Sequence, residues 1–124
     1  MKLFTHNLLI CPKKKCGINS FPLKIVSQKV EKVTTPVNED FLISLIESER
    51  LNWAGLVSAG QNIGLVIPPT IPADYKSNKA FLQALWDVLM DCQVIDGELI
   101  CPLCQRHFPI KNGIPNMLLN EQEF

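Results

Sequence analysis

Two pairs of cysteines lie at opposite ends of the sequence, with Cys11 and Cys16 near its start and Cys101 and Cys104 near its end. Two pairs of closely spaced cysteines can supply the four thiolate ligands of a tetrahedral zinc ion, since each pair binds one side of the metal. A proline follows the first cysteine of each pair, and it fixes φ where the backbone turns around the ion. The sequence therefore predicts one structural zinc ion that fastens the two ends of the chain together.

Two other interpretations of these cysteines remain open. They could be small buried hydrophobic residues, or they could form disulfides in a secreted protein. Residues 1–10 contain no apolar run of signal-peptide length, which favours a reducing cytoplasm or nucleus over secretion. His107 follows Cys104 by three residues and is an alternative ligand, whereas His6 and the fifth cysteine, Cys92, are interpreted as structural residues of the core.

The composition bounds the kind of protein. With 124 residues, of which 47% are hydrophobic, the chain is long enough to form one compact unit with a real core. No stretch approaches the roughly 20 uninterrupted apolar residues of a membrane span. We therefore expect a soluble protein that makes no contact with membranes.

Charge is segregated along the chain although the formal net charge is zero. Residues 1–35 carry seven lysines and one glutamate, whereas residues 36–100 carry nine acids and three bases. The run Lys13–Lys15 has two interpretations: a contact surface for RNA, or an offset for the negative charge of a four-thiolate zinc centre. No patch interleaves aromatic and basic residues, so base stacking is not expected.

The expected elements are strands near both ends of the sequence and helices between them. Residues 21–33 are rich in β-branched residues and predict one or two strands. Apolar stripes behind capping residues predict three helices, and the proline-rich stretch 66–75 predicts a rigid connector. The helices are expected from Thr35 or Asn38, from Asn52 to near Gly64, and from Ser77 or Asn78 to Leu89.

The last third of the sequence predicts strands and turns. Asp96-Gly97 between apolar pairs indicates a β-hairpin whose second strand leads directly to Cys101. The apolar ending around the turn Asn112-Gly113 either closes the sheet or leaves an exposed edge that a partner covers by strand addition. Pro115 favours the edge, because it has no amide donor.

Three stretches of the sequence resemble the multifunctional methyltransferase subunit family, which comprises small zinc-binding activators of eukaryotic tRNA, rRNA and release-factor methyltransferases. They are MKLFTHNLLIC with the following FPLKI, the segment LNWAGLVSAGQNIGL around Trp53, and the ending VIDGELICPLCQRHFPIKNGIPNMLLNE. The string from Phe108 to Leu119 carries the resemblance most specifically.

This resemblance implies an α+β fold in which both chain ends form a small antiparallel zinc-binding sheet domain and the centre is a helical insertion. The expected domains are residues 1–35 plus 92–124 and residues 36–91. The four cysteines match the family's zinc positions, and some members lack them, which indicates a stabilising rather than catalytic metal. The expected partner-binding residues are Phe108, Ile110, Asn112, Gly113, Ile114, Pro115, Asn116 and Met117.

The function implied by the resemblance is a non-catalytic activating and stabilising subunit of S-adenosylmethionine-dependent methyltransferases. It would form heterodimers in the cytoplasm and nucleus, bind the catalytic subunit by strand addition and burial of an apolar patch, and meet RNA at most indirectly. The alternative is a free-standing zinc-ribbon module that binds nucleic acid. A zinc enzyme is disfavoured because four protein ligands leave no open coordination position for water or substrate. The hypothesis of a thiol oxidoreductase is supported only by the C-x-x-C spacing.

Overall fold

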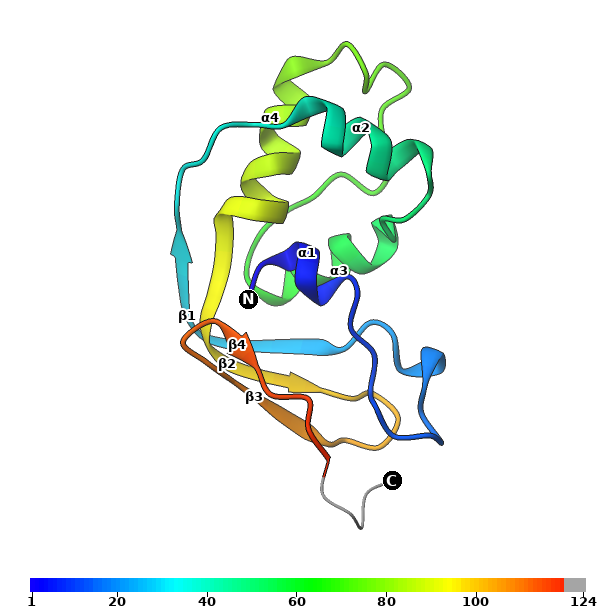
Figure 1. Cartoon of the computed structure of the whole chain (residues 1–124), viewed down its shortest axis with the longest axis vertical. Helices are drawn as coiled ribbons and strands as arrows, with labels where there is room; N and C mark the ends of the chain where they lie inside the picture. The colour runs from blue at the N-terminus through cyan, green and yellow to red at the C-terminus, as the bar shows by residue number, and fades with distance from the viewer. Residues whose placement is uncertain (120–124) are drawn as a thin grey trace.

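The computed structural model describes residues 1–119, so Glu121, Glu123 and the rest of residues 120–124 lie outside the described part. A four-stranded antiparallel sheet forms one end of an elongated molecule, and helices occupy its middle and its other end (Figure 1). The strands are β1 (Lys24–Lys32), β2 (Cys92–Ile100), β3 (His107–Lys111) and β4 (Ile114–Pro115), and they are ordered β1-β2-β3-β4. The α+β class predicted from the sequence is confirmed.

The helices are α2 (Glu39–Glu47), α3 (Trp53–Asn62) and α4 (Lys79–Trp86), and α4 continues as the π-helical turn η2 (Asp87–Asp91). Each begins after an asparagine whose side-chain oxygen accepts the backbone N–H three residues later, at 2.9–3.0 Å. Such caps stabilise a helix start by about 1 kcal/mol each. These caps are Asn38, Asn52 and Asn78, so the three predicted helices are confirmed, and of the alternative starts the structure selects Asn38 over Thr35 and Asn78 over Ser77.

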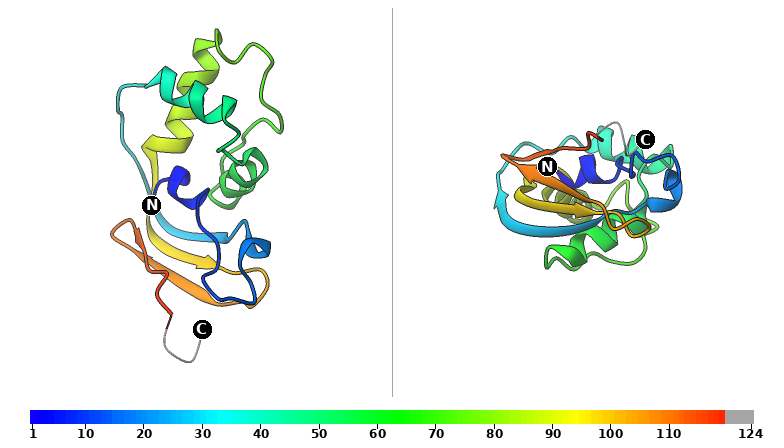
Figure 2. Two further views of the ribbon diagram at one scale, coloured as in Figure 1. Left: turned by 45° about the vertical axis from the view of Figure 1, so that its right-hand side comes forward. Right: turned by 90° about the horizontal axis from the view of Figure 1, so that it is seen from below.

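The register of the sheet places one apolar face toward the rest of the molecule. Ile25 pairs with Leu99, which pairs with Phe108, and all three side chains are buried. The short helix α1 (Leu3–His6) and helix α3 cover this face, as the left panel of Figure 2 shows. Since α1 also contacts η2, the two ends of the molecule share one continuous hydrophobic core.

The predicted hairpin at Asp96-Gly97 is wrong. Strand β2 runs without interruption from Cys92 to Ile100, and Gly97 sits within it, paired with Ser27 of β1 and Ile110 of β3. A Cβ atom at Gly97 would lie 2.3 Å from the carbonyl oxygen of Val26. The glycine is therefore required by the close approach of β1, where the register shifts after Ser27, and not by a turn.

A buried carboxylate holds the segment between β1 and α2 in place. Asp91 is fully buried, and its Oδ1 accepts a hydrogen bond of 2.5 Å from the hydroxyl of Thr35. That hydroxyl accepts a 2.9 Å hydrogen bond from the indole N–H of Trp86. The amide of Val33 also donates to the backbone carbonyl of Asp91. Asp91 therefore binds the segment that follows β1 through both its backbone and its side chain.

His6 is buried in α1, as expected for a structural residue, and its Nε2 donates to the carbonyl of Leu23 at 2.7 Å. Its Nδ1 is buried and has no hydrogen-bond partner among the described residues. Burial lowers the pKa of His6 below 6.5, although the hydrogen bond to Leu23 acts in the opposite direction. The folded protein therefore resists protonation of this ring more than the unfolded chain does.

We expect the free energy of unfolding to fall as the pH drops below about 6.5, because protons then bind His6 in the unfolded chain but not in the folded one. Urea unfolding at about pH 7.5 and about pH 5.5 measures the loss. His6→Gln keeps a side-chain donor for the Leu23 carbonyl but does not titrate, so the variant should lose less stability over this range. An equal loss in both proteins would show that His6 does not cause it.

None of the helices in the described residues 1–119 combines the length and apolarity needed to cross a bilayer.

Candidate metal centre and apolar edge

The structure brings the four predicted metal ligands together at the end of the sheet. The Sγ atoms of Cys11, Cys16, Cys101 and Cys104 all lie within 4.8 Å of one another, and those of Cys11 and Cys104 are 3.9 Å apart. A tetrahedral zinc ion with Zn–S bonds of about 2.3 Å requires sulfur atoms about 3.8 Å apart. The donor set and its spacing therefore fit a four-thiolate metal centre.

The first pair of cysteines lies on a tight turn. The amides of Cys16 and Gly17 both donate to the carbonyl of Lys13 at 3.1 Å, and Cys11 pairs with Gly17 as an isolated β-bridge. The hydroxyl of Ser20 accepts the amide of Cys11 at 2.7 Å and ties the turn to the 3-10 helix η1 (Ile18–Ser20). These contacts hold the two thiols at one end of the loop.

The second pair lies in the connection between β2 and β3. Cys101 directly follows β2, its amide donates to the carbonyl of Arg106 at 3.0 Å, and its carbonyl accepts the amide of Gln105. The amide of Cys104 points at the sulfur of Cys101, at 3.5 Å. Strand β2 therefore does deliver Cys101 to the cluster, as predicted, but the turn that reverses the chain is the cysteine loop itself.

The four clustered thiols change one another's pKa values. Burial, helped by the neighbouring thiols, raises the pKa of Cys16 to about 12. Cys104 is the opposite case: burial would raise its pKa, but the backbone N–H of Arg106 and the other thiols outweigh it and lower the pKa to about 7. One thiol of the cluster therefore ionises readily, whereas ionisation of the others is opposed by burial and by the negative charge already present. A bound divalent cation would stabilise the additional thiolates.

Other groups near the cluster take different roles. His107 is exposed on β3 with its Nδ1 2.7 Å from the carboxylate of Glu98, outside the thiol cluster, so the alternative that it replaces a cysteine ligand is wrong. Cys92 is buried at the start of β2, which agrees with a packing role. Lys14 and Lys15 are exposed on the turn between the first two cysteines.

The apolar ending forms the edge of the sheet. Asn112 and Gly113 have φ values of +52° and +78°, so the predicted turn is confirmed, and the short strand β4 folds back against β3 as the last strand in the order. The side chains of Ile114 and Leu118 are 70% and 80% exposed. Residues Ile114–Leu118 line a shallow depression of about 510 Å³. Both outcomes left open by the sequence occur: the ending closes the sheet and also leaves an apolar edge.

The eight expected partner-binding residues divide into two groups. Phe108 and Ile110 alternate inward along β3 and are fully buried in the chain's own core. The remaining six lie on the turn, on β4 and just after it, where each is exposed or half-buried. Phe108 and Ile110 therefore support the edge from beneath, and the six others form its surface.

A cavity in the helical half was not predicted. Helix α4 was expected to bury its apolar stripe, and Leu82 and Leu85 are buried, but Phe81 of α4 and Val88 of η2 line an open cavity together with Trp53 of α3. The rigid connector 66–75 forms the third wall, so the space depends on how a proline-rich segment is placed. Nothing in the helical periodicity alone could have shown it.

Comparison with known proteins relates nearly the whole chain to one family. The model of the family described as Trm112p-like protein matches residues 2–113. The Bos taurus multifunctional methyltransferase subunit TRM112-like protein is 37% identical over 124 residues, covering 99% of this chain and 98% of its own. The Arabidopsis thaliana homolog A is 37% identical and the Saccharomyces cerevisiae subunit 31%, covering 99% and 96% of each chain.

A solved structure supports the same fold. The chain is similar to a chain of the E. cuniculi Mtq2–Trm112 complex, described as methylating the translation termination factor eRF1. The TM-score is 0.59 and the identity 21%, over 95% of each chain. A match to the family model over most of the sequence, with relatives above 30% identity along the full length, leads to one conclusion: this chain belongs to the Trm112p-like family.

Proposed function

We propose that this chain is a non-catalytic activating and stabilising subunit of S-adenosylmethionine-dependent methyltransferases that act on tRNA, rRNA and translation release factor. Its relatives in animals, plants and fungi are named multifunctional methyltransferase subunits, and the similar solved structure is a complex with Mtq2. The chain would act in the cytoplasm and nucleus as one half of a heterodimer, with RNA met through the complex.

The observation that carries this proposal is the exposed apolar edge at β4. The two-residue edge strand β4 contains the exposed Ile114 and is followed by the exposed Leu118, so it presents unpaired backbone groups and apolar surface to water. A methyltransferase that places a strand of its own beside this edge would gain main-chain hydrogen bonds and bury these side chains at the same time. Pro115 lacks an amide donor, which limits this pairing to the neighbouring residues.

The buried residues of β3 explain why the edge has a fixed position. Phe108 and Ile110 anchor the strand in the core, and Ile110 pairs directly with Pro115 of β4. The amide of Asn116 donates to the carbonyl of Pro109 at 2.9 Å. Because the edge is held before a partner arrives, little conformational entropy is lost on binding.

The metal proposed for the cysteine cluster is zinc, which favours four thiolates in tetrahedral geometry. Cys11, Cys16, Cys101 and Cys104 would hold it and thereby join the start of the chain to the strands that carry the edge. Four protein ligands leave no position for a substrate, so its role would be structural. The proposed domains, residues 1–35 plus 92–124 and residues 36–91, place the metal and the edge in the same unit.

Activation would follow from burial. A methyltransferase with an exposed apolar patch is stabilised by any partner that binds only its folded state, by an amount that grows with partner concentration. The subunit would keep the catalytic chain folded around its cofactor and would not touch the transferred methyl group.

We expect Ile114→Asp to abolish the recovery of methyltransferases with the tagged chain from its own cells, because an unpaired carboxylate would be buried in the interface. Met117→Asp should act in the same direction. Mass spectrometry of the co-purified proteins, with assays of methyl transfer, gives the measurement.

Ile18→Asp is a matched control, since Ile18 is 78% exposed on η1 and lies outside β4. It should retain the partners that wild type retains. Recovery of methyltransferases at wild-type levels with Ile114→Asp and Met117→Asp would refute the role of this edge, and recovery of RNA alone would favour the nucleic-acid module.

A further inference from the structure

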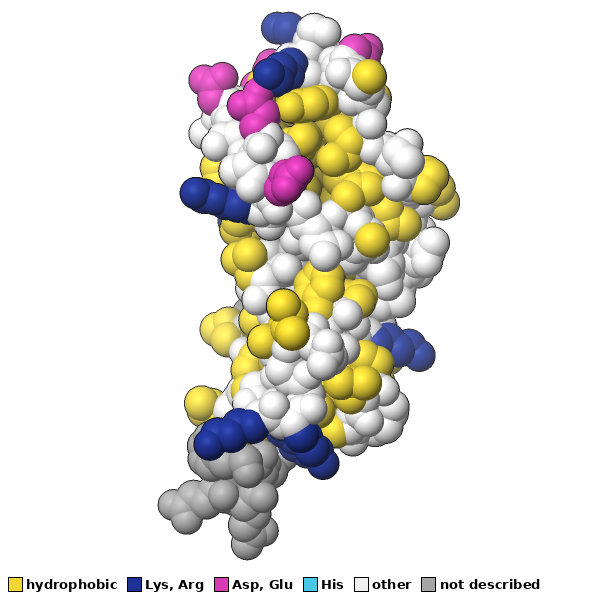
Figure 3. Space-filling view, turned by 90° about the vertical axis from the view of Figure 1, so that its right-hand side faces the viewer, with side chains coloured by type: hydrophobic (Ala, Val, Ile, Leu, Met, Phe, Trp, Pro, Cys, Tyr) yellow, Lys and Arg dark blue, Asp and Glu magenta, His cyan; other side chains and the backbone are white. Residues whose placement is uncertain are grey.

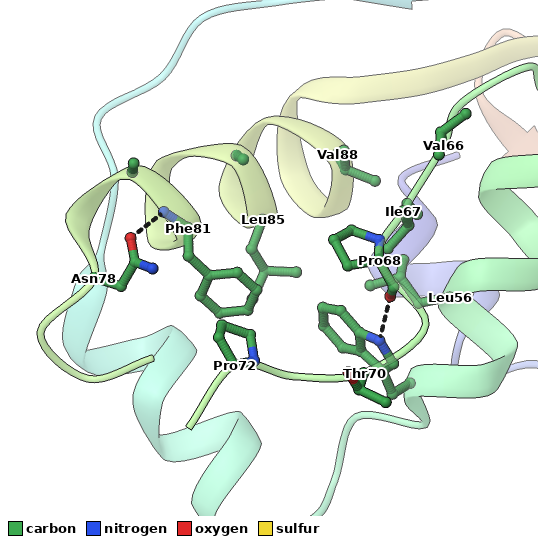
Figure 4. A pocket seen from close by; sticks show the side chains of 13 residues that line it. Leu56, Val66, Ile67, Pro68, Thr70, Pro72, Asn78, Phe81, Leu85 and Val88 are labelled. Carbon is green, nitrogen blue, oxygen red and sulfur yellow. Dashed lines mark hydrogen bonds between the residues drawn. The ribbon is translucent and has the colours of Figure 1, made fainter. Parts of the chain in front are cut away.

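A second apolar surface lies in the helical half of the molecule. A cavity of about 490 Å³ opens between α3, α4 and the connector 66–75, and we call it the α3–α4 groove (Figure 4). Its volume is within the roughly 300–1,000 Å³ range of clefts that hold ligands. It is lined by Trp53, Leu56, Val66, Ile67, Pro68, Thr70, Pro72, Asn78, Ala80, Phe81, Ala84, Leu85 and Val88.

The walls of the groove are held in place by their own contacts. The indole N–H of Trp53 donates to the carbonyl of Pro68 at 2.8 Å, and its ring lies 5.9 Å from that of Phe81. Pro68 and Pro72 restrict the backbone of the connector. Gly60 of α3 meets Ile67 so closely that a Cβ atom there would lie 2.5 Å from the side chain. The groove is therefore preformed and binding would cost little reorganisation.

The lining offers apolar contact and few polar groups. The side-chain oxygen of Asn78 is already used to cap α4, and the carbonyl of Pro68 already accepts the indole N–H. Val66 at the rim is 98% exposed, and apolar side chains form a broad continuous area over this end of the molecule (Figure 3). An occupant must therefore contribute apolar side chains, and such a patch on a folded protein marks an interaction site.

The charges around the groove select the occupant. Residues 36–91 contain seven acidic and three basic side chains, and one of those bases, Lys76, is paired with Glu47. Asp74 is exposed, and its Oδ1 accepts a 3.5 Å hydrogen bond from the side-chain Nδ2 of the lining residue Asn78. Asp87 directly precedes the lining residue Val88, and one exposed base, Lys79, lies between the lining residues Asn78 and Ala80. Figure 3 shows acidic side chains, with some lysine or arginine side chains among them, along the flank of the apolar area.

We propose that the α3–α4 groove binds a basic amphipathic segment of a protein partner, with apolar anchor residues in the groove and Lys or Arg beside the acidic flank. Apolar anchors at helical spacing are a common way for one protein to occupy such a groove, and complementary charge would steer the encounter. An RNA would be repelled by these acids. The site is separate from the β4 edge and does not depend on the proposed function.

The test uses the full chain and a fluorescent peptide of about sixteen residues built from Leu-Lys-Lys-Leu repeats, which places leucines along one helical face. Anisotropy titration should show saturable binding to wild type. Ala84→Lys should weaken it at least about tenfold, because Ala84 is an exposed lining residue and lysine places a cation in the groove. A peptide with glutamate in place of lysine should bind wild type at least about tenfold more weakly.

Gln61→Lys is the matched control, because Gln61 is an exposed residue of α3 that does not line the groove. It should change the affinity by less than about threefold, and circular dichroism checks that both variants fold. Absence of saturable binding, equal affinity for Ala84→Lys and wild type, or equal binding of the glutamate peptide would overturn the proposal. So would a dimer in sedimentation velocity that Ala84→Lys dissociates, since a second copy would then occupy the groove.

Discussion

Serine in place of Cys101 is expected to destabilise the fold severely. Cys101 is fully buried, follows β2 directly and faces three other thiols, so its loss would remove one of four ligands from the proposed zinc ion and leave a polar hydroxyl among them. Structural zinc contributes on the order of 10 kcal/mol to the folding of small zinc domains. This chain also has a hydrophobic core, so we expect a partial loss, seen as a fall in melting temperature of roughly 15 °C or more.

Thermal unfolding by circular dichroism, with the zinc content of each protein measured in parallel, gives the answer. Cys92→Ala is the control, because Cys92 is a buried cysteine outside the cluster and its change should leave the zinc content at one ion per chain. Adding a chelator to wild type should reproduce the effect of Cys101→Ser. A chelator-treated protein with an unchanged melting temperature would contradict the structural role of the metal.

Alanine in place of Gly97 is expected to be the most harmful change of a single glycine. The added Cβ would lie 2.3 Å from the carbonyl oxygen of Val26 and 3.0 Å from the Cα of Ser27. Both neighbours are backbone atoms of the edge strand β1, which pairs with the central strand β2, so they cannot move away without disturbing the pairing of β1 with β2. We expect the free energy of unfolding to fall by about 3 kcal/mol, measured by urea unfolding.

Gly64→Ala is the matched control. Gly64 follows α3 with φ of +83°, and a Cβ there would meet no atom within 4 Å. Alanine in this left-handed conformation should cost only about 1 kcal/mol. Equal losses of unfolding free energy in the two variants would show that the close contact between Gly97 and β1 does not cause the destabilisation.

Local signals in the sequence located most elements correctly. The three helices were predicted because capping residues precede each apolar stripe, and a side-chain cap depends on only a few neighbouring residues. Two starts were left open for the first helix, Thr35 or Asn38, and for the third, Ser77 or Asn78; the structure selects Asn38 and Asn78. The turn at Asn112-Gly113 was predicted for the same reason. The thiol cluster was also predictable, since four sulfur atoms at these spacings have few other uses.

The errors came from contacts between distant parts of the chain. Asp96-Gly97 has the composition of a hairpin turn, but the glycine is fixed by β1, about seventy residues earlier, which no local pattern reports. The α3–α4 groove depends on where the connector 66–75 rests against two helices. The inward direction of Phe108 and Ile110 follows from the pairing of β3 with β2, so the sequence alone did not separate them from the surface residues of the edge.

The rate of methyl transfer by a purified partner methyltransferase, with and without this chain, tests the central claim most directly. The account predicts that the wild-type chain raises both the rate and the melting temperature of the methyltransferase, that Ile114→Asp raises neither, and that the chain alone transfers no methyl group from S-adenosylmethionine. A methyltransferase that is equally active and equally stable without the chain, or methyl transfer by the chain alone, would contradict it.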